Sequence, residues 1–555
     1  EHLRGTTEPL KMLIHYCAGA LLVACCAAST TEGDVVETPA GAVRGWEKQS
    51  RDGRVYQAWT RIPYARPPVG DLRFKAPQPA PRWDGVLNAT DDLPPCLQPL
   101  DDASVEDCLY LNVYRPKISK QKLPVLFSVH GGAFIIGNAG PRNNADYLMD
   151  EDVVLVEVHY RLGVFGFASL GDTVLPGNFG IKDQVLALRW VQRNIRAFGG
   201  DPTSVTVFGE SAGGASVHIL LDSPVCKDLV SRAFSLSGAI NHVWSLLDAG
   251  FVKKYTLKMA QQVNCSEGTS QEILTCLQKA DAMMMINASS VEEDLAHVRT
   301  FVPVIEPSGS QDAVITSDLS KQPTRKSWMS SITSGEYHVF ASSTSEFSRR
   351  DLVTDIRNNL RITLEEIIGN YTDDTTKIEN GSQQLISRYF TDNEDLDNFQ
   401  RELLLMYQDL FFVFPWIFNG KEHSGRKWLS YFEYKGEISS ALNNRALSGQ
   451  PFTDDDPGHA EEVHYYLNFR STVYPDGGPN QTQRDYKVSK RLIQRLTNFA
   501  YYDNPTPCGS AVQWDQFTTN RILRITEKGD FMADENFTQK FQDIYDLWYG
   551  LIGWK

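Results

Sequence analysis

Short apolar runs alternate along this chain with longer helical stretches. Five runs are rich in β-branched or aromatic side chains and have the length of buried strands: residues 123–129, 153–160, 204–208, 233–236 and 428–434. Helical patterns occupy residues 184–198, 212–221, 401–414 and 490–503. This alternation predicts an α/β fold with a large, mostly parallel central sheet, helices on both faces and additional helical insertions.

No obvious boundary divides the chain into domains. At 555 residues and 42% hydrophobic, it is too long for one simple core. However, no linker rich in Pro, Ser or Gly, no charge block, no internal repeat and no low-complexity tract interrupts it. We therefore expect residues 30–555 to form a single large domain with insertions.

The segment FGESAGG at residues 208–214 lies between a predicted strand and a predicted helix rich in small residues. Gly-x-Ser-x-Gly in that position is the pattern of a nucleophile elbow, with Ser211 as the nucleophile. We expect the flanking glycines to let the chain turn sharply and to hold Ser211 in a strained backbone conformation. The bare pattern occurs by chance in long proteins, so the flanking strand and helix carry the prediction.

A serine nucleophile needs donors for the oxyanion that forms on its substrate. The strand predicted at 123–129 runs directly into HGGAF at residues 130–134. A glycine-rich loop after a central strand can turn its N–H groups inward and, with the amide after the nucleophile, form an oxyanion hole. An ordinary turn is the alternative. Because the loop precedes Ser211 by about 80 residues, in the chain order of such hydrolases, we assign the donors to Gly132, Ala133 and Ala212.

Several further motifs occur in a fixed order: IPYA at 62–65, PPVGDLRF at 67–74, EDCLYLNV at 106–113, NFGIKDQ at 178–184 and AFGGDP at 197–202. Together with the elbow, from about residue 35 to 548, they resemble the cholinesterase/type-B carboxylesterase family, and within it insect carboxylesterases of the juvenile-hormone-hydrolysing type. The resemblance implies an α/β-hydrolase fold and a serine carboxylesterase that acts on small-molecule esters without a cofactor.

The resemblance also implies the acid of a catalytic triad. The run SITSGEY at residues 331–337 corresponds to the family's acid segment and gives Glu336, although Gly335 and Tyr337 stand where the family has Asp and Gly. Glu346 and Asp312 are the substitutes if Glu336 is only a solvated loop carboxylate.

The base implied is His459, in DPGHAEE at residues 456–462, where Asp456 replaces the usual Gly. His464 is the competing candidate, expected to be structural on the following helix. We expect no metal, because the spacing of the two histidines around Glu461 and Glu462 is not His-Glu-x-x-His and no third ligand is apparent.

The family pattern further implies four links between motifs. These are the disulfides Cys96–Cys108 and Cys265–Cys276 and the ion pairs Arg73–Glu106 and Arg161–Asp183. Cys17, Cys25 and Cys26 lie in the predicted signal peptide, and of the six cysteines that follow it, Cys226 and Cys508 remain without an assigned bridge.

Two observations concern the substrate. The loop between Cys96 and Cys108 holds eleven residues and no aromatic side chain, whereas in choline-binding relatives it carries a tryptophan that stacks on quaternary ammonium. We therefore expect neutral, apolar esters and poor turnover of acetylcholine. Juvenile-hormone esterases usually carry Gln before the nucleophile; here Glu210 occupies that place. A juvenile-hormone-specific esterase and a non-catalytic cholinesterase-like adhesion protein are the alternatives.

The N-terminal 29 residues predict a secreted protein. Met12 begins a segment whose apolar run, 18–28, ends in small residues, as a signal peptide does, with upstream residues before it. Nine cysteines suit an oxidising compartment. Seven sequons predict glycosylation: Asn88, Asn264, Asn287, Asn370, Asn380, Asn480 and Asn536. We expect no stable membrane anchor, and the formal charge of −15 argues against a nucleic-acid partner. The oligomeric state stays open.

Overall fold

The computed structural model describes residues 31–553 except 93, 100, 120–121, 141–143, 290–299, 322, 342–346, 348, 392–394, 438, 440–455, 469–481 and 518–520. Three sequence predictions fall outside the described residues: the signal peptide before residue 30, the substitute acid Glu346 and the sequon at Asn480.

Thirteen strands in the described part of the chain form one sheet, in the order β1-β2-β3-β5-β7-β6-β8-β9-β10-β11-β12-β13, with β4 paired to β2. The strands are β1 (Thr31–Thr38), β2 (Gly41–Gln49), β3 (Val55–Pro63), β4 (Val86–Asn88), β5 (Tyr110–Pro116), β6 (Leu123–Val129), β7 (Val154–Val158), β8 (Gly200–Glu210), β9 (Arg232–Leu236), β10 (Ser327–Thr333), β11 (Lys427–Phe432), β12 (Leu523–Thr526) and β13 (Gly529–Met532). Each of the five predicted strand runs corresponds to one of these strands.

The middle of the sheet is parallel and its two ends are antiparallel. Neighbouring strands from β7 through β12 all pair in parallel. Strands β1, β2, β3, β5 and β7 pair antiparallel in succession, as do β12 and β13. This arrangement confirms the predicted α/β-hydrolase fold. It also brings the carboxyl ends of β6, β8, β9 and β10 to one edge of the sheet, where ligands of α/β folds bind.

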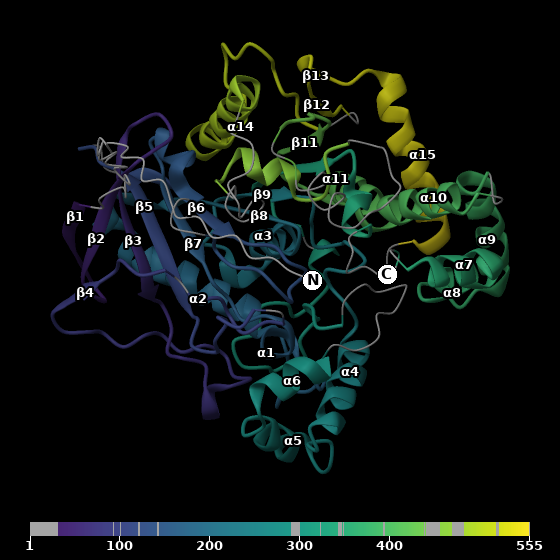
Figure 1. The fold of residues 1–555 in the computed structure, drawn as a ribbon, viewed down its shortest axis with the longest axis horizontal. Coiled ribbons are helices and arrows are strands. Elements are labelled where there is room, and N and C mark those ends of the chain that lie inside the picture. The colour runs from purple at the N-terminus through teal and green to yellow at the C-terminus, as the bar shows by residue number, and fades with distance from the viewer. Residues whose placement is uncertain are drawn as a thin grey trace, which may run out of the picture.

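Both faces of the sheet are buried. Along β6, Val125 and Phe127 belong to one hydrophobic core, whereas Leu126 between them belongs to a second core on the other face. The first core includes α2 (Phe179–Asn194) and α3 (Ala212–Asp222), and the second includes α14 (Gln483–Tyr502). The expectation of helices on both faces is therefore confirmed (Figure 1).

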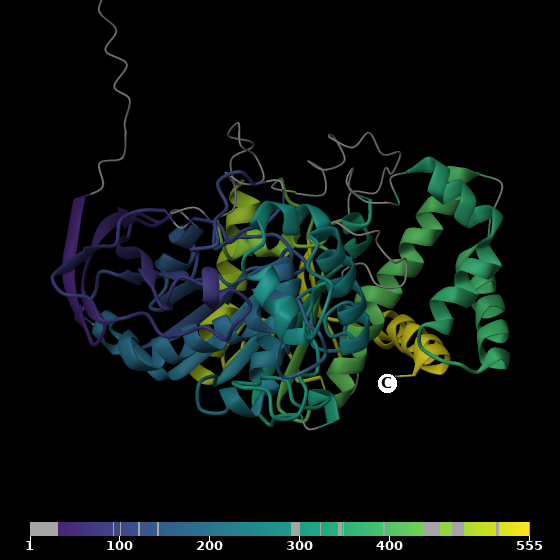
Figure 2. The same ribbon diagram turned by 90° about the horizontal axis from the view of Figure 1, so that it is seen from below.

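The remaining helices form insertions at two places around this core. One group lies below the sheet in Figure 1 and contains α4 (Ala249–Gln262), α5 (Ser270–Leu277) and α6 (Ala282–Ser289), with the short α1 (Gly163–Phe167) beside it. The other projects to one side in Figure 2 and contains α7 (Arg350–Asn358), α8 (Leu360–Gly369), α9 (Thr375–Tyr389) and α10 (Leu396–Gln408). There α15 (Glu535–Ile552) packs against α9 and α11 (Phe414–Glu422).

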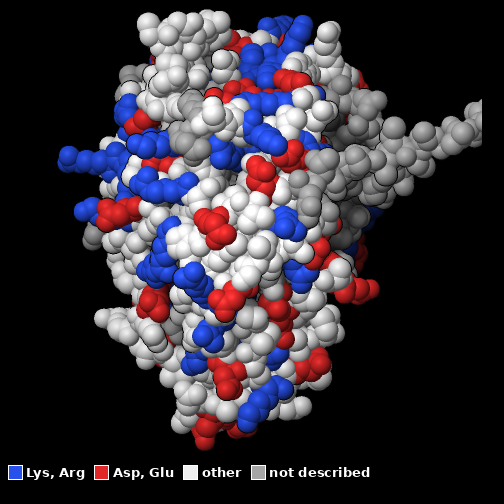
Figure 3. Space-filling view, turned by 90° about the vertical axis from the view of Figure 1, so that its left-hand side faces the viewer, with Lys and Arg blue, Asp and Glu red and all other residues white. Residues whose placement is uncertain are grey.

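One continuous helical stretch, Leu396–Glu422, is long and apolar enough to cross a membrane by length and composition. Its most apolar window is 89% buried inside the molecule, as in the core helix of a soluble protein. The face of the molecule in Figure 3 carries basic and acidic side chains interspersed, with no broad area of a single charge.

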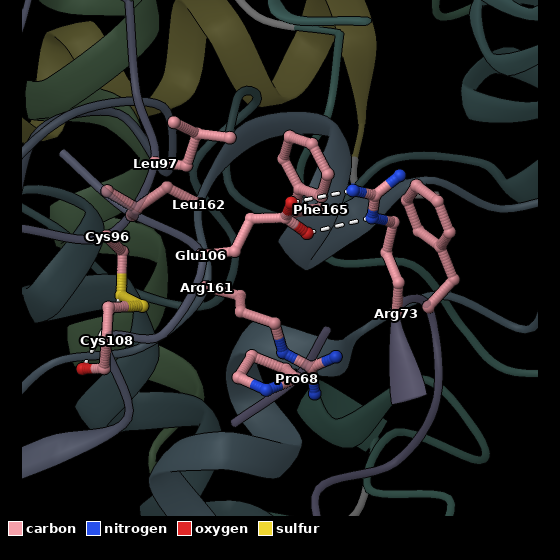
Figure 4. A pocket seen from close by; sticks show the side chains of 10 residues that line it. Pro68, Arg73, Cys96, Leu97, Glu106, Cys108, Arg161, Leu162 and Phe165 are labelled. Atoms are coloured by element: carbon pink, nitrogen blue, oxygen red, sulfur yellow. Dashed lines mark hydrogen bonds and ion pairs between the residues drawn. A yellow bond between two sulfur atoms is a disulfide. The ribbon is translucent and has the colours of Figure 1, made fainter. Parts of the chain in front are cut away.

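The four family-implied links between motifs are present. Disulfides join Cys96 to Cys108 and Cys265 to Cys276, while Cys226 is buried and Cys508 exposed, both as free thiols. The Arg73 guanidinium donates two hydrogen bonds to the Glu106 carboxylate, 2.6 and 2.8 Å long, beside the first disulfide (Figure 4).

The second ion pair is the more deeply buried. Arg161 donates from Nε and Nη2 to Asp183 at 2.8 and 2.7 Å, with side chains 4% and 0% exposed. Burial raises the pKa of Asp183, and the guanidinium partly offsets that rise. The pair links α2 directly to the loop after β7.

We expect Asp183→Ala to destabilise the protein by about 3–5 kcal/mol, because it leaves the Arg161 charge buried and unpaired. Urea unfolding followed by tryptophan fluorescence measures the change. The matched control is Asp351→Ala, which breaks an exposed Arg349–Asp351 pair and should leave the transition nearly unchanged. Equal effects of the two substitutions would show that the buried pair adds nothing to stability.

Candidate active site

Ser211 lies between the end of β8 and the first residue of α3, with φ 56° and ψ −122°. The left-handed conformation therefore belongs to the serine itself. Gly209 and Gly213 do not have positive φ; instead, a Cβ on either would lie 2.6 or 2.1 Å from the Val129 carbonyl oxygen. A Cβ on Gly209 would also lie 2.6 Å from the Gly213 carbonyl carbon. The flanking glycines therefore allow the sharp turn through the close approach of β8, α3 and β6, while the strained backbone conformation belongs to Ser211.

The oxyanion loop follows β6 and is also strained. Gly132, Ala133 and Phe134 have φ of 103°, 56° and 63° in succession. Only glycine can occupy position 132, because a Cβ there would lie 2.1 Å from the Ile136 carbonyl oxygen. Within the described residues, the amides of Gly132, Ala133 and Ala212 donate to no protein acceptor. They are therefore available to a ligand, as the oxyanion assignment requires.

Glu336 and His459 meet across two loops. Glu336 begins the 3₁₀ turn Glu336–Val339 after β10 and is completely buried. His459 Nδ1 lies 2.6 Å from Glu336 Oε2. The backbones of the two loops join directly, since Gly335 donates its N–H to the Pro457 carbonyl at 3.0 Å. The acid is thus held against the imidazole by both side-chain and main-chain bonds.

Two of the three departures from the family motifs, Gly335 and Asp456, meet at this junction. A Cβ on Gly335 would lie 2.9 Å from the Pro457 carbonyl oxygen and 3.2 Å from the Asp456 Cβ. Gly335, where the family has Asp, therefore leaves room for the loop that carries Asp456, where the family has Gly. In both this chain and the family pattern, one of the two positions is therefore a glycine. The departure at Gly335 does not argue against Glu336 as the acid of the triad.

Sequence reasoning missed Ser237, which follows β9 at the edge where Ser211 follows β8. Its hydroxyl donates to Glu336 Oε1 at 2.5 Å, and the Thr333 N–H donates to the same oxygen at 2.8 Å. Ser237 is buried and has a positive φ of 51°. The available signal was its place directly after a predicted strand, where polar residues of parallel sheets collect.

Two further carboxyls surround the imidazole. His459 Nε2 lies 3.1 Å from Glu210 Oε1, and Ser211 makes no hydrogen bond to His459 in this state. The pKa of Glu210 is raised to about 7, mainly by burial. The His459 charge lowers this pKa, and the Glu336 charge adds to the rise. Burial raises the pKa of Glu462 to about 8, against a hydrogen bond from Ser331 that lowers it. Burial therefore brings the pKa of both carboxyl groups close to neutral pH.

An aromatic residue on a π-helical turn covers the His459 ring. The turn Asp409–Val413 interrupts the helix between α10 and α11. It leaves the Phe411 carbonyl to accept from His242 Nδ1 at 2.8 Å and from Trp244 Nε1 at 3.1 Å. Phe412 on this turn packs on His459 with ring centroids 4.9 Å apart. Such turns often occur at functional sites.

The alternative site residues lie elsewhere. Asp312 is exposed and makes no ion pair with His459. His464 is buried in the 3₁₀ turn Glu461–Tyr465 that follows the His459 loop.

Among the described residues, one cluster has side chains of the kind that bind metal ions: His218, Asp222 and His423. Their potential ligand atoms lie within 4.8 Å of one another. However, His218 Nδ1 accepts the Ile240 N–H, so its Nε2 carries a proton toward Asp222. That tautomer matches a hydrogen-bonded acid–base pair better than a metal ligand.

We expect kcat/KM to fall as pH drops through a midpoint above the ordinary histidine value of about 6.5. Burial lowers the pKa of His459, but the charges of Glu210 and Glu336 outweigh it and raise the pKa overall. The protonated imidazole cannot accept the serine proton, so activity is present above the raised pKa and lost below it. A pH–rate profile measures the midpoint. Glu210→Gln should move the midpoint down; a midpoint that stays in place would contradict this electrostatic role.

Comparison with known proteins identifies the family. Residues 32–543 match the family model described as "Carboxylesterase family". The chain belongs to the carboxylesterase family. This carboxylesterase is 32% identical over 507 residues to a carboxylic ester hydrolase of Bombus ignitus, with 87% of this chain and 88% of the relative covered. It is 32% identical to esterase FE4 of Myzus persicae, with 94% and 93% covered.

Two juvenile hormone esterases are also similar to this carboxylesterase. One, from Tribolium castaneum, is 45% identical over 270 residues, which cover 46% of this chain and 45% of the relative. The other is the crystal structure of juvenile hormone esterase from Manduca sexta with OTFP covalently attached, which superposes with a TM-score of 0.82 at 25% identity and covers 94% of this chain and all of that chain. The enzyme is therefore a carboxylic ester hydrolase.

Proposed function

We propose that this carboxylesterase hydrolyses neutral, apolar carboxylic esters through an acyl-enzyme on Ser211, with His459 as base and Glu336 as the acid that orients it. The observation that carries the proposal is the 2.6 Å bond from His459 Nδ1 to Glu336 beside a serine held at positive φ. This chemistry requires a small-molecule ester and water as its two substrates.

The steps follow from these positions. Ser211 Oγ attacks the ester carbonyl carbon while His459 Nε2 takes the hydroxyl proton, and the amides of Gly132, Ala133 and Ala212 stabilise the oxyanion. The bond from carbon to the alcohol oxygen breaks, and His459 returns its proton to that oxygen. A water molecule then attacks the acyl-enzyme with His459 again as base, which releases the acid and restores Ser211.

A fluorophosphonate probe tests the proposal directly, because an activated serine displaces its fluoride and forms a stable covalent adduct. We expect one covalent adduct per chain, on the tryptic peptide that contains Ser211, and complete loss of ester hydrolysis. An adduct on another serine, or activity that survives full labelling of Ser211, would refute the assignment. A chain without any adduct or activity would support the non-catalytic adhesion protein instead.

Acetylcholine should be a poor substrate. The Cys96–Cys108 loop lacks an aromatic side chain, so the cation–π contact worth about 0.5–2 kcal/mol in choline recognition has no counterpart in that loop. We expect kcat/KM for acetylcholine at least tenfold below that for 3,3-dimethylbutyl acetate, the neutral ester of the same shape, at matched ionic strength. Faster turnover of acetylcholine would contradict the assignment to neutral esters.

Juvenile hormone is a second candidate substrate, supported by the similarity to the two juvenile hormone esterases. Glu210 stands against it, since the resemblance leads us to expect Gln before the nucleophile in such enzymes. Direct comparison of kcat/KM for juvenile hormone with that for a simple apolar ester decides between a specific and a general esterase.

We also propose that the enzyme is secreted, as one domain over residues 30–555. The two disulfides support an oxidising compartment, and the one sheet that runs from β1 to β13 supports the undivided domain. Six predicted glycosylation sites lie on exposed side chains: Asn88, Asn264, Asn287, Asn370, Asn380 and Asn536. Mass spectrometry of the protein from an insect-cell medium would locate the mature N-terminus and the glycans.

A further inference from the structure

The side chain of Gln98 is bound to the backbone of a glycine far along the chain. Gln98 is the second residue after Cys96 in the disulfide-closed loop and is 5% exposed. Its Oε1 accepts the Gly137 N–H at 2.8 Å, and its Nε2 donates to the Gly137 carbonyl at 3.1 Å and to the Cys96 carbonyl at 3.0 Å. A reversed amide would place its NH₂ against an N–H and its oxygen against two carbonyl oxygens. The contact therefore requires an amide in this one orientation.

Gly137 packs directly against the start of the oxyanion loop. Its φ is 122°, and a Cβ on it would lie 2.4 Å from the Gly131 carbonyl oxygen and 2.5 Å from His130 Nδ1. The absence of a side chain thus lets its backbone approach both residues closely. In the described part of the chain, the backbone of Gly137 makes both of its hydrogen bonds with Gln98. The Gln98 amide therefore holds Gly137 against the residues that open the oxyanion loop.

The oxyanion loop needs support because its backbone is strained. Ala133 and Phe134 both have positive φ, which costs free energy in residues other than glycine and persists only where surrounding contacts hold it. From the segment after β7, the Tyr160 hydroxyl donates to the His130 carbonyl at 2.9 Å, and the Gly163 N–H donates to the Phe134 carbonyl at 2.6 Å. These bonds hold residues 130 and 134, and the bonds from Gln98 hold the chain where it leaves the loop.

The disulfide loop gives Gln98 a fixed backbone. The disulfide closes this loop beside Leu97 (Figure 4). Within it, the Leu97 N–H donates to the Val105 carbonyl at 2.9 Å, and the Gln98 N–H donates to Ser104 Oγ at 3.3 Å. The loop that carries no aromatic side chain for a substrate cation is thus joined to the oxyanion loop through Gln98.

We propose that Gln98 is a positioning residue for ester hydrolysis, an inference that rests on the proposed function. Through Gly137, it keeps the oxyanion loop in the conformation that turns the Gly132 and Ala133 amides toward the transition state. Donors that are already oriented need no reorganisation when charge develops on the substrate oxygen. A loop without this support would still admit the ester but would stabilise the transition state less.

Two ketones with the same carbon chain separate these two effects. With 1,1,1-trifluoro-2-octanone, Ser211 Oγ adds to the carbonyl carbon, the π electrons of the C=O bond move to the oxygen, and the hydroxyl proton passes to His459. The adduct carries an oxyanion, as the transition state does. The carbonyl of 2-octanone is not activated and stays a ketone, so its Ki measures ground-state binding.

The variants are Gln98→Ala and Gln98→Met in the full-length enzyme. Methionine has nearly the length of glutamine but no amide, so Gln98→Met removes the hydrogen bonds and keeps a buried side chain. Removal of one oxyanion donor lowers kcat by about 10²–10³, so we expect displacement of the loop to lower kcat by about 10–100-fold with KM nearly unchanged. The Ki of trifluoro-octanone should rise by the same factor as kcat/KM falls, and that of 2-octanone should change by less than about twofold.

Gln192→Ala is the matched control. Gln192 on α2 donates from Nε2 to the Pro202 and Leu229 carbonyls at 2.8 and 3.4 Å. Pro202 lies near the amino end of β8, whereas Ser211 follows its carboxyl end. The control therefore loses bonds from a glutamine amide to the backbone away from the site, and it should keep the wild-type kcat/KM and both Ki values.

Gln98 variants with the kinetics and both Ki values of the wild type would overturn the inference. So would equal weakening of the two ketones, which would indicate a general loss of the binding site. Thermal unfolding shows whether each variant is folded, and a Gln98→Met variant that does not fold would assign the side chain to the fold as a whole and also overturn the inference. If the proposed function were wrong, the wild type itself would hydrolyse no ester and would bind the two ketones equally.

Discussion

Replacing Ser211 or His459 by Ala should each lower kcat for a p-nitrophenyl ester by a factor on the order of 10⁶, and the double variant should lose little more. The two residues act as one unit, because the hydroxyl is a poor nucleophile until the imidazole takes its proton. Residual hydrolysis above the rate in water would come from the oxyanion amides and substrate binding.

Steady-state kinetics on purified variants measures this effect, with circular dichroism to show that each variant is folded. His464→Ala is the matched control, since it removes the nearby histidine and leaves His459. More than a tenth of wild-type kcat in Ser211→Ala, or a His464→Ala variant impaired as strongly as His459→Ala, would refute the assigned mechanism.

Glu336→Gln should lower kcat by about 10⁴-fold. Glu336 Oε1 accepts from both Ser237 and the Thr333 N–H, so the amide oxygen of the glutamine would take that position. Its NH₂ group would then face His459 Nδ1, which needs an acceptor. The imidazole would adopt the tautomer with the proton on Nε2, and that nitrogen could no longer accept the serine proton.

The measurement is kcat together with the pH profile, because the lost charge should also lower the pKa of His459. Glu379→Gln, an exposed carboxylate on α9, serves as the control. A Glu336→Gln variant that keeps more than a tenth of wild-type kcat would mean that the orienting acid lies elsewhere in the chain. The kcat of Ser237→Ala should lie between that of the wild type and that of Glu336→Gln. The substitution removes one of the two donors to Glu336 Oε1 but leaves the carboxylate charge.

Local patterns in the sequence were sufficient for the elements that carry the site. The runs at residues 123–129 and 204–208, which form β6 and part of β8, have a hydrophobic core on each side, so most of their side chains are apolar. The elbow and the oxyanion loop are short segments with glycine where the backbone or a neighbouring carbonyl admits no side chain, which is why their patterns could be recognised without a structure.

Contacts between distant segments were decided only by the tertiary structure. His459 and Glu336 are 123 residues apart, and Ser237 and Glu336 are 99 apart. Their meeting depends on the strand order β9-β10-β11, which places side by side the ends of the strands that precede Ser237, Glu336 and His459. In the sequence, Gly335 and Asp456 are two separate departures from the family motifs, and only the contact between their loops shows that one makes room for the other.

By itself, the sequence predicted the α/β class, the nucleophile elbow and the oxyanion loop, because strand periodicity and tight turns impose local restrictions on residue type. The α/β-hydrolase fold and the segments expected to hold the acid and the base were implied by the resemblance of its motifs to the family. Only the tertiary structure decided which groups surround the imidazole. Ser237 and the buried acids Glu210 and Glu462 were not assigned to that site from the sequence, and Phe412 reaches His459 through a π-helical turn. The physical reason is that burial, and with it the pKa of a carboxyl group, is a property of packing between segments that no local pattern encodes.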